Sequence, residues 1–314
     1  MNGSSIVRFS LFLLSTFTFV TQSGTCATLL VGQNQLYKAP SDAAAVAHDG
    51  DRIEIEPGQY FDCTVWRTNN LLIEGTAAGV IITDKTCMGK GIFVVAGNNT
   101  TIRNLTLTRA RVADMNGAGI RLDGGDLLVD GVRFIDNQDG ILGGGFVPET
   151  TVTIINSYFE KNGYCGEGVG CAHAIYVNNV NLLRVTKSTF INTQMGHSIK
   201  SRALRTEIIG CNISDGPEGT SSFLIDVPNG GTLIVRDNTL EKGPKSQNHS
   251  AAIEIGAEGV THPTPEIEIS NNTLRNDGDY QTTLLMNVTA TPALLKGNQL
   301  SGHVTALRGD GRVE

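Results

Sequence analysis

The sequence predicts an all-β solenoid, a single-stranded right-handed parallel β-helix that is closed at its first turn by a short N-terminal capping helix. Three observations predict this fold. An octet of alternating polar and apolar residues recurs eight times, its fifth column holds residues that tolerate a left-handed backbone, and another short strand precedes most copies. Repeats at intervals of roughly 20–50 residues are typical of stacked supersecondary units, each of which contacts mainly its neighbours.

The composition agrees with a folded chain that turns often. Of 314 residues, 40% are hydrophobic and 18% are charged, and glycine occurs 37 times. A disordered protein would have fewer apolar groups, and glycine is common in turns. The formal net charge of −7 argues against a nucleic-acid partner, because binding to a polyanion needs a basic surface.

The first 27 residues predict a secretory signal peptide. Arg8 precedes the apolar run Leu11–Val20, and small residues close the segment at Thr25-Cys26-Ala27. The run is too short to span a bilayer, so we expect no membrane span and a secreted or periplasmic protein. Residues 28–314 then form one β-helix domain.

Export also implies an oxidising compartment, in which disulfides persist. Five cysteines remain after Cys26, so one of them must stay unpaired. We predict a disulfide between Cys165 and Cys171, which flank a glycine-rich loop, and consider a second one between Cys63 and Cys87.

The octets predict two short strands that meet at a tight bend. Columns three and eight are apolar in every copy and should face inward, whereas column five holds Asn, Gly, Asp or Lys. Column six becomes Asn238, Asn272 and Asn298 in the last three copies, and asparagines stacked at strand spacing can form an amide ladder. The eight copies begin at Thr100, Leu127, Val152, Leu183, Thr206, Leu233, Ile267 and Ala293.

Additional strands complete each turn of the coil. They begin at Gly91, Ala118, His173, His197, Phe223 and Ala251. Parallel crossovers are overwhelmingly right-handed, so the coil should be right-handed too. Residues 41–50, which follow Pro40, predict a short helix over the open first turn, whose strand runs from Arg52 to Glu56.

These repeats, the asparagine-rich bends and the segment Gly50-Asp51-Arg-Ile…Pro57-Gly58-Gln-Tyr60 resemble the pectin-lyase-like superfamily of right-handed parallel β-helix proteins, over residues 30 to 310. More narrowly, residues 197–203, 223–231 and 253–259 are similar to exported bacterial β-helix proteins without an assigned reaction. The resemblance implies polysaccharide lyases, epimerases or hydrolases, or non-catalytic adhesins and tailspikes. We therefore expect a monomer whose partner is a polysaccharide.

One row of ionisable residues is the best candidate site. Side chains alternate along a strand, so Tyr176, Lys200, Asp226 and Glu254 should point outward while their isoleucine neighbours point inward. Their spacings of 24, 26 and 28 residues are one turn each, and neighbouring strands lie about 4.8 Å apart. We therefore predict an exterior row, flanked by Arg202 and His197. Further candidates for substrate binding are Arg121, Asp123, His173, Asn178, Asn229 and Glu258.

Three functions fit this row. In a uronate lyase or C5-epimerase, Lys200 or Arg202 would neutralise the sugar carboxylate, and Lys200, Tyr176 or His197 would exchange the C5 proton. In a glycoside hydrolase, Asp226 and Glu254 would be the two carboxyl groups, separated by roughly 5 Å for retention. In a non-catalytic glycan-binding or surface protein, the row would be an exposed ladder of salt bridges.

The strand Lys200-Ser201 is similar to the lysine-bearing strand of β-helix alginate and chondroitin lyases. Those enzymes carry an arginine one turn later, where this chain has Asp226, and acidic metal ligands upstream, where it has Gln194, Met195 and Gly196. Only the role of Lys200 is therefore implied. We expect no metal ligands and no cofactor, and calcium is suggested by the resemblance alone.

Overall fold

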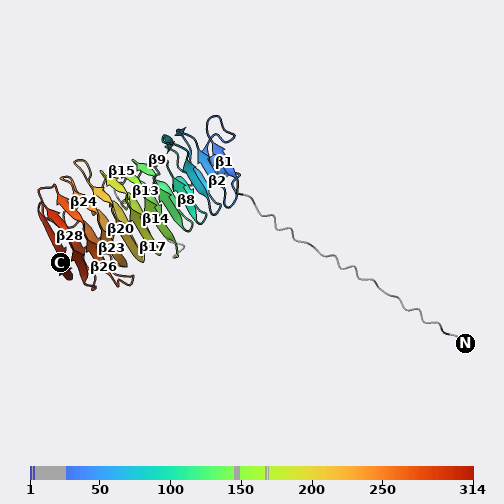
Figure 1. Cartoon of the computed structure of the whole chain (residues 1–314). Coiled ribbons are helices and arrows are strands. Elements are labelled where there is room, and N and C mark those ends of the chain that lie inside the picture. The colour runs from blue at the N-terminus through green and yellow to red at the C-terminus, as the bar shows by residue number, and fades with distance from the viewer. Residues whose placement is uncertain (2, 4–25, 145–148, 167, 169) are drawn as a thin grey trace.

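The structure is a computed structural model that describes residues 1, 3, 26–144, 149–166, 168 and 170–314. Nearly all of the predicted signal peptide lies outside these residues. The described chain winds into an elongated coil of stacked β-strands that runs from β1 to the C-terminus (Figure 1). Within the described part, no helix is long and apolar enough to cross a membrane.

Each strand of the coil pairs in parallel with the strand one turn later, and three sheets result, here called A, B and C. Sheet A contains β1 (Thr28–Val31), β2 (Arg52–Ile55), β5 (Leu72–Gly75), β8 (Thr100–Arg103), β11 (Leu127–Asp130), β14 (Thr151–Ile155), β17 (Leu182–Thr186), β20 (Arg205–Ile209), β23 (Thr232–Arg236), β26 (Ile267–Ser270), β29 (Ala293–Lys296) and β32 (Gly311–Val313). Sheet B contains β3 (Gly58–Tyr60), β6 (Val80–Thr83), β9 (Thr106–Thr108), β12 (Arg133–Ile135), β15 (Tyr158–Glu160), β18 (Thr189–Ile191), β21 (Asn212–Ser214), β24 (Thr239–Lys242), β27 (Thr273–Asn276) and β30 (Gln299–Ser301). Sheet C contains β4 (Thr64–Trp66), β7 (Gly91–Val95), β10 (Ala118–Leu122), β13 (Asp139–Gly143), β16 (Ile175–Val177), β19 (Ile199–Ser201), β22 (Ile225–Val227), β25 (Ile253–Ile255), β28 (Thr282–Asn287) and β31 (Val304–Arg308).

The octets form the bend between sheets A and B, as predicted. The third-column residues are completely buried, and all eight fifth-column residues have a positive φ between 50° and 65°. This backbone conformation favours Gly and Asn, which explains the composition of the column. The fifth-column residues are Asn104, Gly131, Asn156, Lys187, Gly210, Asp237, Asn271 and Gly297.

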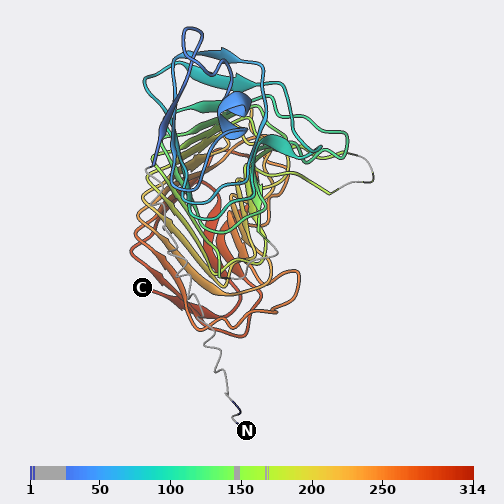
Figure 2. The same ribbon diagram turned by 90° about the vertical axis from the view of Figure 1, so that its right-hand side faces the viewer.

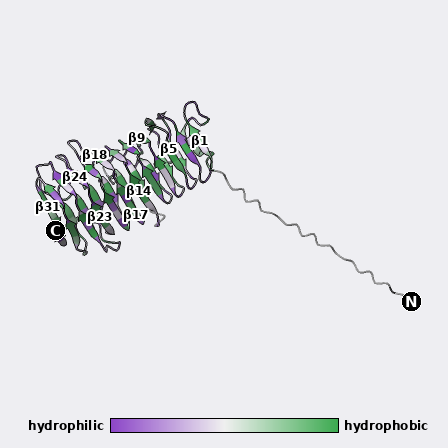
Figure 3. Cartoon of the chain, in the orientation of Figure 1, coloured by the Kyte–Doolittle hydropathy of each residue, from purple (hydrophilic) through white to green (hydrophobic). Residues whose placement is uncertain are grey.

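Buried hydrophobic side chains form one core cluster along the interior of the coil. Figure 3 shows that hydrophobic residues recur in the strands from one end of the coil to the other. Phe134, Phe159 and Phe190 stack at centroid distances of 4.6 and 4.5 Å, because consecutive turns place the eighth column in register. The predicted amide ladder is confirmed: Asn238 Nδ2 donates to Asn272 Oδ1 at 2.9 Å, and Asn272 Nδ2 donates to Asn298 Oδ1 at 3.0 Å.

The capping helix is shorter than residues 41–50. It is α1 (Pro40–Ala44), and it lies at the N-terminal end of the coil against β1, β2 and β4 (Figure 2). The first strand predicted from the sequence is β2. The strand β1, which pairs with β2, was not predicted. Both considered disulfides are present, Cys63–Cys87 and Cys165–Cys171, and Cys211 is a buried thiol.

Candidate functional site

The predicted row exists on the outer face of sheet C. Tyr176 pairs with Lys200, Lys200 with Asp226, and Asp226 with Glu254, so the four side chains lie on consecutive strands β16, β19, β22 and β25. Arg121 belongs to the same row, but Leu142 of β13 separates it from Tyr176. The strand β13 and its turn of the coil were not predicted from the sequence.

The row is not exposed, which corrects the expectation of an exterior ladder. The side chains of Lys200 and Asp226 are 9% and 4% exposed, and Glu254 is completely buried. The segments that follow β22 and β25 contact each other and Arg202, because Asn229 donates to Gly259 O at 3.1 Å and His262 Nε2 lies 3.1 Å from Arg202 O. These segments have no repeat pattern, so their position could not be read from the spacing of the strands.

Lys200 is held between two carboxylates. Its Nζ lies 3.0 Å from Asp226 Oδ2 and 2.7 Å from Glu258 Oε1. Burial alone would lower the pKa of the Lys200 ammonium, but Asp226 and Glu258 outweigh burial and raise the pKa above its ordinary value. Lys200 is therefore a positive charge at neutral pH, suited to holding an anion rather than to accepting a proton.

Arg202 lies two residues beyond Lys200 on the same face and joins the row to its flanks. Its Nη2 lies 2.5 Å from Glu258 Oε2, its Nε donates to the Tyr176 hydroxyl at 2.9 Å, and its Nη1 donates to Asn229 Oδ1. Asn178 Oδ1 is 3.5 Å from the same Tyr176 oxygen. Of the predicted binding residues, Asn178, Asn229 and Glu258 are thus brought to the row.

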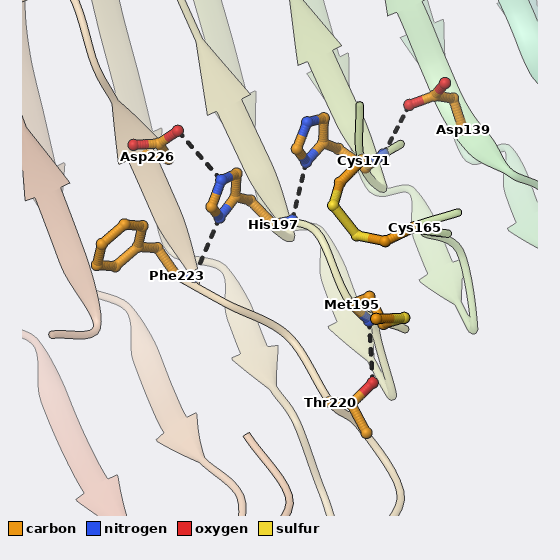
Figure 4. Close-up of a disulfide and its surroundings, with 9 residues drawn as sticks. Asp139, Cys165, Cys171, Met195, His197, Thr220, Phe223 and Asp226 are labelled. Atoms are coloured by element: carbon orange, nitrogen blue, oxygen red, sulfur yellow. Dashed lines mark hydrogen bonds and ion pairs between the residues drawn. A yellow bond between two sulfur atoms is a disulfide. The ribbon is translucent and has the colours of Figure 1, made fainter. Parts of the chain in front are cut away.

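His173 and His197 form an aligned stack beside the row, with their rings 4.8 Å apart. Figure 4 shows the His197 ring between Asp226 and Phe223. Each Nδ1 accepts a hydrogen bond from the backbone N–H one turn later: His173 from His197 at 2.9 Å and His197 from Phe223 at 3.1 Å. Asp139 continues the pattern by accepting from His173 N at 2.7 Å.

This pattern fixes the tautomer of His197. Because its Nδ1 is an acceptor, the proton of the neutral ring is on Nε2, which lies 3.3 Å from Asp226 Oδ2. Burial, only partly opposed by Asp226, lowers the pKa of His197 to about 4. Burial likewise places the pKa of His173 well below its ordinary value. Both rings are neutral at pH 7, so His197 orients Asp226 and does not act as a proton acceptor through Nε2.

Asp226 and Glu254 form a coupled carboxyl pair. Burial first, and then the hydrogen bond and charge of Asp226, raise the pKa of Glu254 well above its ordinary value. Glu254 Oε1 accepts a hydrogen bond from Ala257 N at 2.6 Å. Its Oε2 is buried and has no hydrogen-bond donor among the described residues. A glycosidase needs two carboxyl groups that both reach the scissile bond. The complete burial of Glu254 does not favour that arrangement.

Arg121 and Asp123 lie apart from this cluster. Arg121 Nε is 3.2 Å from Asp123 Oδ1, and Asp123 Oδ2 is 2.5 Å from Lys90 Nζ. Among the described residues, no three His, Cys, Asp or Glu side chains are grouped to hold a metal ion.

The comparisons with known proteins agree with this fold. A family model described as a right handed beta helix region matches residues 146–309, more than half of the chain, and the chain belongs to that family. The sequence matches no curated protein significantly.

A solved structure of low identity shares the fold, and two others match with TM-scores below 0.5. An alginate lyase from Paenibacillus sp. str. FPU-7 is 16% identical with a TM-score of 0.62, over 91% of this chain and 99% of that one. The pectin methylesterase PemA from Erwinia chrysanthemi is 12% identical with a TM-score of 0.42, over 90% of this chain and 82% of that one. The A-module of the mannuronan C-5 epimerase AlgE4 from Azotobacter vinelandii is 14% identical with a TM-score of 0.39, over 87% of this chain and 93% of that one.

Two features of the candidate site were not predicted from the sequence. Asp139 is one turn before His173, a position that the overlooked strand β13 would have revealed. Glu258 was expected to bind substrate, but in the structure its carboxylate binds Lys200 and Arg202. Nothing in the local sequence signals that contact.

Proposed function

We propose that this protein binds an extended polysaccharide along sheet C and acts on its uronate residues as a lyase or C5-epimerase. One observation carries the proposal: two cations flank Tyr176 in an otherwise buried row. Arg202 Nε donates to the Tyr176 hydroxyl at 2.9 Å, and Lys200, on the next strand, has its Nζ 6.0 Å from the centroid of the Tyr176 ring. The lyase of similar fold, at 16% identity, contributes only the β-helix frame.

The chemistry assigns one role to each group. Lys200 and Arg202 hold the uronate carboxylate and neutralise its charge, which makes the C5 proton more acidic. Tyr176 transfers protons. Its oxygen accepts a hydrogen bond from Arg202 at 2.9 Å, and its hydroxyl donates only a long hydrogen bond, of 3.5 Å, to Asn178 Oδ1. As the phenolate it takes the C5 proton, and as the phenol it gives a proton back. In a lyase, the C5–H and C4–O bonds break, a C4=C5 double bond forms, and the leaving oxygen takes a proton. In an epimerase, C5 regains a proton on its other face.

Asp226 and His197 act through Lys200. Asp226 fixes the ammonium at 3.0 Å, and the neutral His197 ring lies 3.3 Å from the same carboxylate oxygen. They are positioning residues. The two disulfides agree with the predicted export to a secreted or periplasmic location, because disulfides persist in oxidising compartments.

The test uses the mature chain with alginate, polygalacturonate and other uronic-acid polysaccharides. Lyase products carry unsaturated ends that absorb ultraviolet light, and an epimerase incorporates deuterium at C5 from heavy water. Lys200→Met and Tyr176→Phe should abolish either product, whereas Glu266→Ala, on an exposed side chain, should not. Unchanged turnover in Lys200→Met would reject the assignment.

A non-catalytic glycan-binding protein is the second candidate. It is favoured by the complete pairing of charges in the row, where Lys200 and Arg202 face Asp226 and Glu258. Tight binding of a uronic-acid polysaccharide without any product after long incubation would support it over the enzyme.

A further inference from the structure

The carboxylate of Glu258 is held as a bound anion would be. One of its oxygens contacts Lys200 Nζ at 2.7 Å and the other contacts Arg202 Nη2 at 2.5 Å. The two cations therefore bind the two ends of a single carboxylate. Charge-assisted contacts of this kind are the strong ones in carboxylate recognition.

The backbone that carries Glu258 is fixed. Glu258 N donates to Pro228 O at 3.0 Å, and Gly256 N donates to Val227 O at 3.1 Å. Gly259 O accepts from Asn229 Nδ2 at 3.1 Å. A hinged loop would not have its main chain pinned before, at and after the residue that moves, so the segment is not a lid.

The side chain of Glu258, in contrast, is accessible. It is 47% exposed, whereas the side chains of Lys200 and Arg202 are 9% and 22% exposed. Burial would raise the pKa of the Glu258 carboxyl, but the two cations outweigh burial and lower the pKa below its ordinary value. The group stays ionised and is the solvent-facing part of the cation pair.

We propose that Glu258 is a built-in competitor that occupies the carboxylate subsite of Lys200 and Arg202, and that an acidic sugar binds by exchanging its own carboxylate for that of Glu258. This inference rests on the proposed function. The exchange requires only rotation of the Glu258 side chain toward solvent, while the backbone of residues 256–259 stays in place.

The exchange selects for charge. A uronate replaces one carboxylate by another, so Lys200 and Arg202 keep a counter-charge throughout. A neutral sugar that displaced Glu258 would leave Arg202 without its counter-charge and Lys200 with Asp226 alone, which is costly. Glu258 therefore weakens the binding of a uronate, because the state in which the subsite is open is only partly populated. A neutral sugar has no carboxylate to exchange and leaves Glu258 in place.

The test measures binding by calorimetry in a Tyr176→Phe background, in which turnover is stopped. The probes are trisaccharides of mannuronate and of galacturonate, with β-1,4-mannotriose as the neutral control. Glu258→Ala should raise the affinity for at least one uronate trisaccharide about tenfold, which corresponds to roughly 1.4 kcal/mol. It should leave mannotriose binding unimproved. The matched variant Glu266→Ala removes the same charge from an exposed side chain 3.9 Å from Arg205 and should change neither affinity.

A second measurement does not depend on activity. Glu258→Ala should unfold at a lower temperature than the parent, and saturating uronate trisaccharide should restore the loss while mannotriose should not. The proposal is overturned if folded Glu258→Ala binds both uronates no better than the parent. In that case, uronate products formed by the wild type would still support the proposed function. If Glu258→Ala binds a uronate better but the wild type forms no products, the competitor role of Glu258 stands and the lyase or epimerase assignment is rejected.

Discussion

Asp226 and Glu254 place two carboxyl groups on adjacent strands of sheet C, and burial together with the neighbouring Asp226 raises the pKa of Glu254 to about 9. The proton on Glu254 leaves a balanced cluster, in which Lys200 and Arg202 oppose Asp226 and Glu258. A buried row of this kind is stable only if its charges cancel. The protonation of Glu254 is therefore part of the architecture of the site.

The two carboxyl groups should respond differently to amidation. Glu254→Gln keeps the shape of a group that is already neutral, so the thermal midpoint should change by less than about 2 °C. Asp226→Asn removes the charge that Lys200 and His197 contact and should cost about 1–3 kcal/mol. Thermal unfolding at pH 7 of both variants checks this contrast. Equal losses would argue that Glu254 is ionised.

Asp139 should make the protein less stable as the pH rises. Burial raises the pKa of its carboxyl to about 8, although His173 N–H partly opposes the rise. In the unfolded chain the group ionises near its ordinary pKa of 3.8, so between pH 3.8 and pH 8 the folded state holds one more proton. The free energy of unfolding that Asp139 contributes is fully present below pH 3.8. It is lost as the pH rises toward 8, by up to about 1.4 kcal/mol per pH unit.

Asp139→Asn keeps the acceptor for His173 N–H and removes the titration. Urea unfolding from pH 5 to 8 should therefore fall less steeply with pH for the variant than for the wild type. Parallel curves would show that Asp139 is charged in the folded protein.

His197 should make the protein less stable in mild acid. Its pKa is lowered from 6.5 to about 4, so the unfolded chain takes up a proton that the folded chain refuses between these values. Stability is present above pH 6.5 and is lost as the pH falls toward 4. In His197→Asn, the thermal midpoint should lose part of this acid dependence, even if the midpoint at pH 7 is lower. An unchanged slope would contradict the prediction.

Lys242 should be the most sensitive lysine of the chain. Its side chain is completely buried inside the coil, where Nζ lies 3.7 Å from Asp215 Oδ2 and donates to Ser222 O at 2.5 Å. Lys242→Met leaves the buried Asp215 carboxylate without its cation. The free energy of unfolding in urea should therefore fall by roughly 3–5 kcal/mol. The control Lys245→Met breaks the exposed pair with Glu218 and should leave the urea midpoint nearly unchanged.

The amide ladder should contribute as much to the free energy of unfolding as an apolar side chain in the core. Asn272 is completely buried, donates to Asn298 and to Val235 O, and accepts from Asn238. Asn272→Leu leaves these groups unpaired, at a cost of about 2–4 kcal/mol. Gln299→Ala removes an exposed amide on the next strand and should be neutral in the same unfolding assay. Equal effects would mean that the ladder contributes nothing specific.

Much of the fold follows from the sequence because its rule is local and repeated. A buried apolar residue such as Ile102 and a bend residue such as Asn104 occur at the same positions in all eight octets, and burial of the one and the positive φ of the other fix the register of the strands. Register in turn placed Tyr176, Lys200, Asp226 and Glu254 side by side, as predicted. Where the pattern was weak, as at β1 and β13, a strand was missed.

The sequence by itself determined the coil, its bends and the row of ionisable residues, because each depends on neighbours one repeat away. Only the tertiary structure decided that the row is covered, that Glu254 is protonated, and that Glu258, 58 residues beyond Lys200, binds its ammonium. The physical reason is that burial and ion pairing depend on the paths of non-repeating segments such as residues 256–264. No periodicity encodes those paths.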